Sequence, residues 1–252
     1  MLVRTVAGSI QQDVAAMTYG ELNRLDRLLD LQQPIPGAPD GVFFIAAHQI
    51  TELWFKVILE ELDRTRRAMD ANDLWEARYR LARVRSGEDV LVSHLRAIES
   101  ISPGNFALIR AQLGSSSAFE SVQFREIEFV SGLKDRRYLD GDRLTATERR
   151  RLEARWAEPS LVDAFEVLLD VRGRPDLAEV CAGRTDPELF MLIEGLLDHD
   201  EGFTRWRTAH AAMAERLIGY RPGTGGSSGV EYLHATTGKR FFPRLWEIRS
   251  VL

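Results

Sequence analysis

Residues 40–70, DGVFFIAAHQITELWFKVILEELDRTRRAMD, decide the fold of this chain. Apolar side chains recur along them at helical spacing, which predicts one long helix with a single buried stripe. That stripe consists of Phe44, His48, Phe55, Leu59 and Leu62. Residues 73–101 predict a second long helix after the short turn at residues 71–72, so the two helices should pack antiparallel.

Helical periodicity also dominates the rest of the chain, and no run of alternating β-branched residues requires a sheet. A short helix should start at Ser102-Pro103, which has the pattern of an N-cap followed by proline, and end near Gly114. Further helices are expected over residues 15–32, 118–131 (capped by Ser115–Ser117), 145–157, 160–171 and 186–217, and the polar segment 132–145 is expected to be the most mobile loop. The chain is therefore predicted to be one all-α domain, a helical bundle spanning residues 1–252.

Composition narrows the class of protein. The chain has 252 residues, 44% of them hydrophobic, and a net charge of −5 without a basic tail, which argues against nucleic acid as the main partner. Its one cysteine, Cys181, cannot form an intramolecular disulfide or a cysteine-rich metal site. No apolar leader and no uninterrupted stretch of 18 apolar residues occurs. We expect a cytoplasmic protein with no membrane partner.

Two histidines share apolar helix faces. His210 lies in residues 206–229, WRTAHAAMAERLIGYRPGTGGSSG, within a stripe formed by Phe203, Trp206, Met213 and Leu217. The helix should stop near Gly219, and a loop dense in backbone donors follows from Gly223 to Gly229. Each histidine could simply be a hydrogen-bonded core residue. However, one imidazole on each of two facing long helices is a common way to hold haem or another cofactor.

Arg110 is the third candidate, because it follows Phe106 by four residues on a largely apolar face. A guanidinium in such surroundings needs an anion. The alternatives are an arginine that reaches solvent or one paired with a core glutamate. The functional interpretation is capture of a carboxylate on a substrate or cofactor.

The GTGGSSG loop does not fit the nucleotide-binding motifs. It lacks the Gly-Lys-Ser/Thr ending of a Walker A motif, misses the dinucleotide-binding spacing and follows a helix rather than a strand. It could close over a ligand and offer backbone N–H groups and the Thr224 hydroxyl to an anion, or it could be a flexible linker. Other metal sites are poorly supported, since no HExxH motif occurs and Asp198-His199-Asp200 is interpreted as a solvated helix face. His94 and His234 are expected to be structural.

Several stretches resemble the signature blocks of the tryptophan 2,3-dioxygenase family. They are HQITELWFKVILEELD, LGSSSAFESVQFREIEF, WRTAHAAMAERLIGYRPGTGGSSGVEYL and the ending RFFPRLWEIR, in family order and over roughly residues 17–250. The resemblance implies an all-α fold that holds one haem b between long helices, usually in a homotetramer. The N-terminal helix, within residues 1–35, is expected to pack on a neighbouring subunit.

The resemblance also implies roles for individual residues. His210 would be the axial ligand of the haem iron, and His48 would lie on the distal side as the catalytic residue that hydrogen-bonds the indole N–H. Arg110 would bind the substrate carboxylate, and Phe44 and Phe106 would pack against the indole ring. The other positions implied are Ser117 in the haem pocket, Thr224 at the amino-acid head group, Tyr19 and Leu22 near the substrate, and the loop glycines Gly223, Gly225, Gly226 and Gly229.

The match departs from the family pattern at a few positions. Leu22 stands where a second tyrosine is common, Ala118 where glycine is usual and Glu120 where glutamine is usual. The first expectation is an O2-dependent dioxygenase that converts L-tryptophan to N-formylkynurenine. The first alternative is monooxygenation of tryptophan or β-methyltryptophan to a 2-oxindole in specialised metabolism. The second alternative is a non-catalytic haem sensor or carrier.

Overall fold

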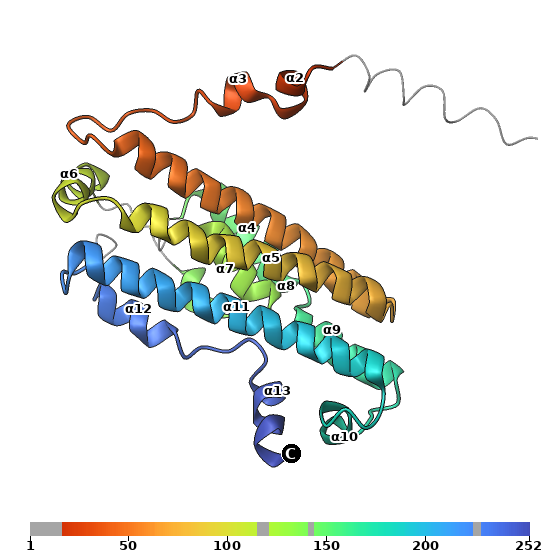
Figure 1. Ribbon diagram of the computed structural model, residues 1–252. Helices are drawn as coiled ribbons and strands as arrows, with labels where there is room; N and C mark the ends of the chain where they lie inside the picture. Colours follow the sequence, from red (N-terminus) through yellow and green to blue (C-terminus); the bar gives the residue numbers. More distant parts are fainter. Residues whose placement is uncertain (1–16, 115–120, 141–143, 224–227) are drawn as a thin grey trace, which may run out of the picture.

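A computed structural model describes residues 17–114, 121–140, 144–223 and 228–252, and within these ranges every regular element is a helix (Figure 1). The elements are α2 (Tyr19–Asn23), α3 (Leu25–Leu28), α4 (Gly41–Asp70), α5 (Leu74–Glu99), α6 (Pro103–Leu113), α7 (Val122–Val130), η2 (Arg136–Tyr138), α8 (Ala146–Ala157), α9 (Leu161–Val171), α10 (Leu177–Cys181), α11 (Pro187–Ile218), α12 (Val230–Thr236), α13 (Pro243–Ile248) and η3 (Arg249–Val251). The predicted all-α class is confirmed.

Three long helices, α4, α5 and α11, form the body of the molecule, and α5 packs along both of the others (Figure 1). The α4–α5 turn is tight because Asn72 adopts a left-handed φ of 54°. The Asp73 side chain then caps α5 by accepting the backbone N–H of Glu76 at 2.9 Å. This is the predicted antiparallel pair.

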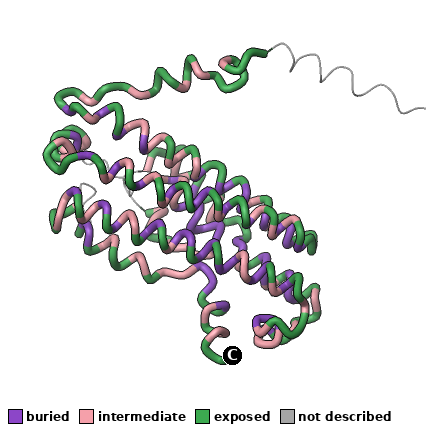
Figure 2. Tube along the Cα trace, in the orientation of Figure 1, coloured by how far each residue is buried: buried purple, intermediate pink, exposed green. Residues whose placement is uncertain are grey.

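The core is the apolar seam between these helices, and buried residues follow their inward faces (Figure 2). Leu62 of α4, Val84 of α5 and Leu196 of α11 are fully buried. Gly87 lets α4 and α5 approach closely, since a Cβ there would lie only 3.1 Å from the Ile58 side chain. Because α4 and α11 both pack closely on α5, α5 sets the position of each relative to the other.

The ends of α6 and α11 follow their sequence signals. Ser102 caps α6 by accepting the Asn105 backbone N–H, and Pro103 is its first residue. Asp186 caps α11, which runs to Ile218 and stops at Gly219 in a left-handed conformation. The predicted limits of both helices are confirmed.

Two predicted helices differ from the structure. The segment predicted as one helix over residues 15–32 contains two short helices, because Arg24 adopts a left-handed φ of 50° between α2 and α3. Neither short helix has a buried residue, so no tertiary packing extends them. The helix predicted to begin at Ala118 begins at Val122, with Ser121 as its N-cap. The Ser115–Ser117 cap lies outside the described residues.

The interpretation of Asp198-His199-Asp200 as a solvated helix face is wrong for two of its three residues. His199 and Asp200 are fully buried. His199 binds Glu88 of α5 through Nδ1 at 2.7 Å and Ser131, at the end of α7, through Nε2 at 2.8 Å. An Asp200 carboxylate oxygen accepts the backbone N–H groups of residues 241 and 242 and the indole N–H of Trp246. These partners are far away in sequence, and they connect α11 to three other segments: α5, the end of α7 and residues 241–246.

Helix α4 is, among the described helices, the one long and apolar enough to cross a membrane by length and composition. One such helix is weak evidence for a membrane span. Its inward face carries part of the core, and its outward face exposes a row of apolar side chains. Those exposed residues are Val42, Phe43, Ile50, Leu53 and Val57. An outward apolar row of this kind is also typical of a surface that another protein covers.

Candidate functional site

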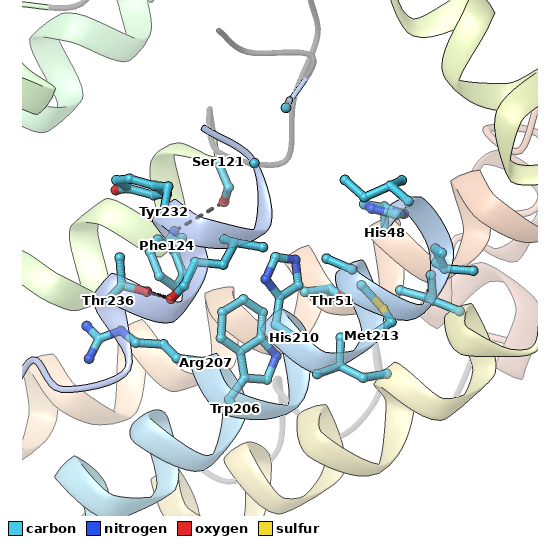
Figure 3. A pocket seen from close by; sticks show the side chains of 18 of the residues that line it. His48, Thr51, Ser121, Phe124, Trp206, Arg207, His210, Met213, Tyr232 and Thr236 are labelled. Carbon is cyan, nitrogen blue, oxygen red and sulfur yellow. Dashed lines mark hydrogen bonds between the residues drawn. The ribbon is translucent and has the colours of Figure 1, made fainter. Parts of the chain in front are cut away.

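A cavity of about 510 Å³ lies among α4, α5, α6, α7, α11 and α12. This volume is in the range of sites that hold small molecules or cofactors. Aromatic and aliphatic side chains form most of its wall, and a few polar groups reach it (Figure 3). Seven of the predicted site residues line it together: Phe44, His48, Phe106, Arg110, His210, Gly223 and Gly229.

His210 projects into this cavity from the last third of α11, beside Trp206 (Figure 3). Among the described residues, no group forms a hydrogen bond with either of its ring nitrogens. Burial, and to a smaller extent the nearby His48, lower the pKa of His210 to about 4. The imidazole is therefore neutral at physiological pH, with a nitrogen lone pair available to a ligand.

His48 reaches the same cavity from α4. Its Nδ1 lies 2.8 Å from the carbonyl oxygen of Phe44, which can only accept, so Nδ1 carries the proton. Burial lowers the pKa of His48, although the Phe44 carbonyl and Glu52 act in the opposite direction. The neutral ring therefore presents Nε2 as a hydrogen-bond acceptor.

Phe44 and Phe106 form an aromatic corner next to His48. Their ring centroids are 6.0 Å apart at an interplanar angle of 63°, and Phe44 also lies 4.1 Å from the His48 ring. Phe44 is buried and Phe106 is partly buried. The corner offers two ring faces to a planar apolar group beside a hydrogen-bond acceptor.

Arg110 lies on α6, one turn beyond Phe106, and its guanidinium donates to the carbonyl oxygen of Pro222. Pro222 comes immediately before the GTGGSSG loop, so Arg110 connects α6 to the start of that loop. Gly229 closes the other end at a φ of 70°, where a Cβ would lie 2.3 Å from the Arg221 carbonyl oxygen. Only glycine fits that position. With five N–H donors, Arg110 keeps capacity to bind an anion in the cavity.

Two further predicted site residues do not line this cavity. Tyr19 and Leu22 are exposed, at 76% and 62%, on the short helix α2, which lies apart from the bundle (Figure 1). They do not line the cavity of their own chain. Ser117, Ala118, Glu120, Thr224, Gly225 and Gly226 lie outside the described residues.

Sequence reasoning missed a charged group at the cavity wall. Arg125 and Arg207 both donate to Glu128, at 2.6 and 2.8 Å, and all three side chains are buried. Burial lowers the pKa of Arg207, while Glu128 acts in the opposite direction. The spacing of Arg125 and Glu128 on α7 was a local signal. The pairing with Arg207 on α11 had none, because it depends on how the two helices pack.

The donor set indicates the kind of cofactor that fits. Among the described residues, no group of three His, Cys, Asp or Glu side chains could hold a metal ion by itself. One neutral imidazole in a largely apolar cavity instead suits a cofactor that brings most of its own ligands, such as haem. His210 and the apolar wall therefore fit haem, with His48 and Arg110 left for a second ligand.

Known proteins resemble this chain over nearly its full length. A family profile described as "Tryptophan 2,3-dioxygenase" matches residues 5–175 and 180–252. A tryptophan 2,3-dioxygenase of Nocardioides sp. is 42% identical, over 97% of this chain and 98% of the relative. One from Herpetosiphon aurantiacus is 39% identical over 94% and 99%, and one from Pseudomonas fluorescens is 36% identical over 94% and 92%.

Proposed function

This chain belongs to the tryptophan 2,3-dioxygenase family, and on that basis we propose that it is an enzyme that converts L-tryptophan and O2 to N-formylkynurenine. In this reaction the indole C2–C3 bond breaks and each of the two carbons gains one oxygen atom, so the product retains both atoms of O2. The observation that carries the proposal is one cavity in which a neutral His210, without a hydrogen-bond partner among the described residues, lies together with His48, Arg110 and an aromatic corner.

His210 would hold haem b as its axial ligand. When bound, the haem supplies the iron centre at which O2 is activated. The fit rests on the lone pair of a neutral imidazole, to which no described residue forms a hydrogen bond, and on the apolar wall around it. The protein's own contribution is to place the indole ring, fix its direction and exclude water.

Arg110 and the aromatic corner would bind the amino acid. Phe44 and Phe106 would pack against the indole ring, and the Arg110 guanidinium would bind the α-carboxylate. A charge-assisted hydrogen bond of this kind contributes about 2 kcal/mol. The two groups would thereby fix both ends of the substrate.

His48 would accept the indole N–H through Nε2. Its tautomer supports this role, because Nδ1–H donates to the Phe44 carbonyl and Nε2 is left without a proton. The acceptor is present only while the ring is neutral, and burial favours the neutral ring. Thr224 would bind the amino-acid head group and Ser117 would face the haem.

We further propose a cytoplasmic homotetramer in which residues 1–35 pack on a neighbouring subunit. The exposed apolar row on α4 and the exposed Tyr19 and Leu22 support a subunit contact. Tyr19 and Leu22 could then reach a neighbour's cavity. Size-exclusion chromatography with light scattering tests the assembly, and deletion of residues 1–35 should reduce it.

The decisive experiment is mass spectrometry of the product from reduced, haem-loaded protein given O2 and L-tryptophan. We expect a mass increase of two oxygen atoms. An increase of one oxygen atom, with tryptophan or β-methyltryptophan, would instead identify a 2-oxindole-forming monooxygenase. Haem binding without O2-dependent turnover of either substrate would identify a carrier or sensor.

A further inference from the structure

Trp206 and His210 lie one helical turn apart on α11, and their rings are nearly parallel. The ring centroids are 5.1 Å apart and the interplanar angle is 9° (Figure 3). This is an offset-stacked pair, one of the two arrangements that aromatic rings prefer. The flat face of the indole therefore restricts rotation of the imidazole.

Trp206 is itself held firmly. Phe55 of α4 meets its ring edge to face at 5.7 Å, Phe124 of α7 lies at 5.3 Å, and Phe203 stacks at 5.9 Å. Only 8% of Trp206 is exposed. The indole thus belongs to an aromatic cluster contributed by three helices, and it cannot turn without disturbing them.

His210 forms no hydrogen bond with a described residue. A metal-bound histidine almost always donates its second ring N–H to a carboxylate, a backbone carbonyl or water, and that bond sets the ring orientation. No described residue accepts from His210. The Trp206 indole nitrogen cannot do so, because it is a donor, and it also has no hydrogen-bond partner among the described residues.

We propose that Trp206 is the positioning residue of the haem ligand: its ring stack fixes the orientation of the His210 imidazole. This inference rests on the proposed function, since it takes His210 as the iron ligand.

The test compares two kinds of substitution in the haem-loaded protein. Trp206→Phe keeps a ring at this position, whereas Trp206→Leu and Trp206→Met remove it. Methionine fills irregular gaps well, so its variant provides a second folded ring-free protein if the leucine variant is unstable. Phe129→Leu is the matched control, because it removes a fully buried aromatic side chain that does not line the cavity.

Two readouts separate positioning from general stability. The first is haem affinity, measured by titration of the Soret band. The second is the iron–histidine stretching band of the ferrous protein, measured by resonance Raman spectroscopy. The ring-free variants should bind haem about tenfold more weakly, because an aromatic pair contributes about that factor. Their band should broaden or shift, whereas Trp206→Phe and Phe129→Leu should keep the wild-type band.

The outcomes distinguish this inference from the proposed function. A wild-type band and affinity in both ring-free variants would refute the role of Trp206 and leave the proposed function intact. An equal band change in Phe129→Leu would refute it as well, since the effect would then be general destabilisation. Wild-type protein that takes up no haem would refute the proposed function and this inference with it.

Discussion

His199 and His210 lie about three turns apart on the same helix, yet their hydrogen bonding and surroundings differ. Both ring nitrogens of His199 are engaged, by Glu88 and Ser131, and the side chain is fully buried. His210 has no described hydrogen-bond partner and faces a cavity. A histidine whose bonds are all made has little left for a ligand, whereas one kept neutral without partners is available to a metal. The first half of α11 therefore supports the bundle and the second half carries the proposed chemistry.

The largest expected effect is the complete loss of haem binding when His210 is replaced. His210→Ala removes the one proposed axial ligand, so the variant should show no stable Soret band after reconstitution. Its secondary structure should be retained, because His210 has no described hydrogen bond to lose. Absorption and circular dichroism spectra measure the two properties. A normal haem spectrum in this variant would refute the ligand assignment.

The matching substitution at His199 should reduce the stability of the fold and leave haem binding unchanged. His199→Ala leaves the Glu88 carboxyl group in the core without its partner, and burial already raises the pKa of Glu88. We expect the free energy of unfolding to fall by about 3 kcal/mol. Urea denaturation measures it. Protein that remains folded should keep the wild-type haem spectrum; a changed spectrum with unchanged stability would contradict the division along α11.

The two histidines also show what sequence patterns could and could not reveal. Helical periodicity predicted α4, α5 and α11, because one apolar stripe per helix is enough to specify a bundle. The same periodicity placed His48 and His210 on buried faces. His199 was wrongly assigned to a solvated face, because its partners lie far away in sequence, on α5 and at the end of α7.

Two further features could not be predicted from sequence patterns: the break between α2 and α3, and the contact of Arg110 with the residue before the GTGGSSG loop. The break at Arg24 reflects the absence of packing on α2 and α3, which no local pattern encodes. The bond from Arg110 to Pro222 joins residues more than a hundred positions apart. By contrast, the Trp206–His210 stack spans four residues of one helix, and the spacing alone could have suggested it.

Protonation of His210 at acidic pH should lower the free energy of unfolding of the haem-free protein. The pKa of His210 is about 4 in the folded chain against an ordinary value of 6.5, so the unfolded chain binds more protons between these values. Stability is then full above pH 6.5 and falls as the pH is lowered towards 4, by about 3 kcal/mol. Urea midpoints across this range measure the slope. His210→Phe should flatten it, and an unchanged slope would show that other groups cause it.

Arg110→Ala should weaken substrate binding without affecting the cofactor. Loss of about 2 kcal/mol corresponds to roughly a thirtyfold higher KM for tryptophan. Tryptamine, which lacks the carboxylate, should be affected much less. Arg221→Ala is the matched control, since this exposed arginine lies beside the same proline. Steady-state kinetics with both substrates measure the difference, and equal losses for both would exclude a carboxylate contact.

The smallest expected effect concerns two hydroxyl groups, one bonded to His199 and one at the cavity of His210. Ser131 is fully buried and its hydroxyl bonds to His199 at 2.8 Å, so Ser131→Ala should reduce the free energy of unfolding by about 1 kcal/mol. The Thr51 hydroxyl, at the cavity, bonds to the Ala47 carbonyl one turn earlier on α4. The Ala47 carbonyl already accepts a backbone hydrogen bond within α4, and alanine has a higher helix propensity than threonine. Thr51→Ala should therefore change the free energy of unfolding by less than about 0.5 kcal/mol. Urea denaturation resolves the two values. An equal loss in the free energy of unfolding for Thr51→Ala and Ser131→Ala would contradict this difference. The polar network around His199 would then contribute no more to stability than the cavity wall near His210.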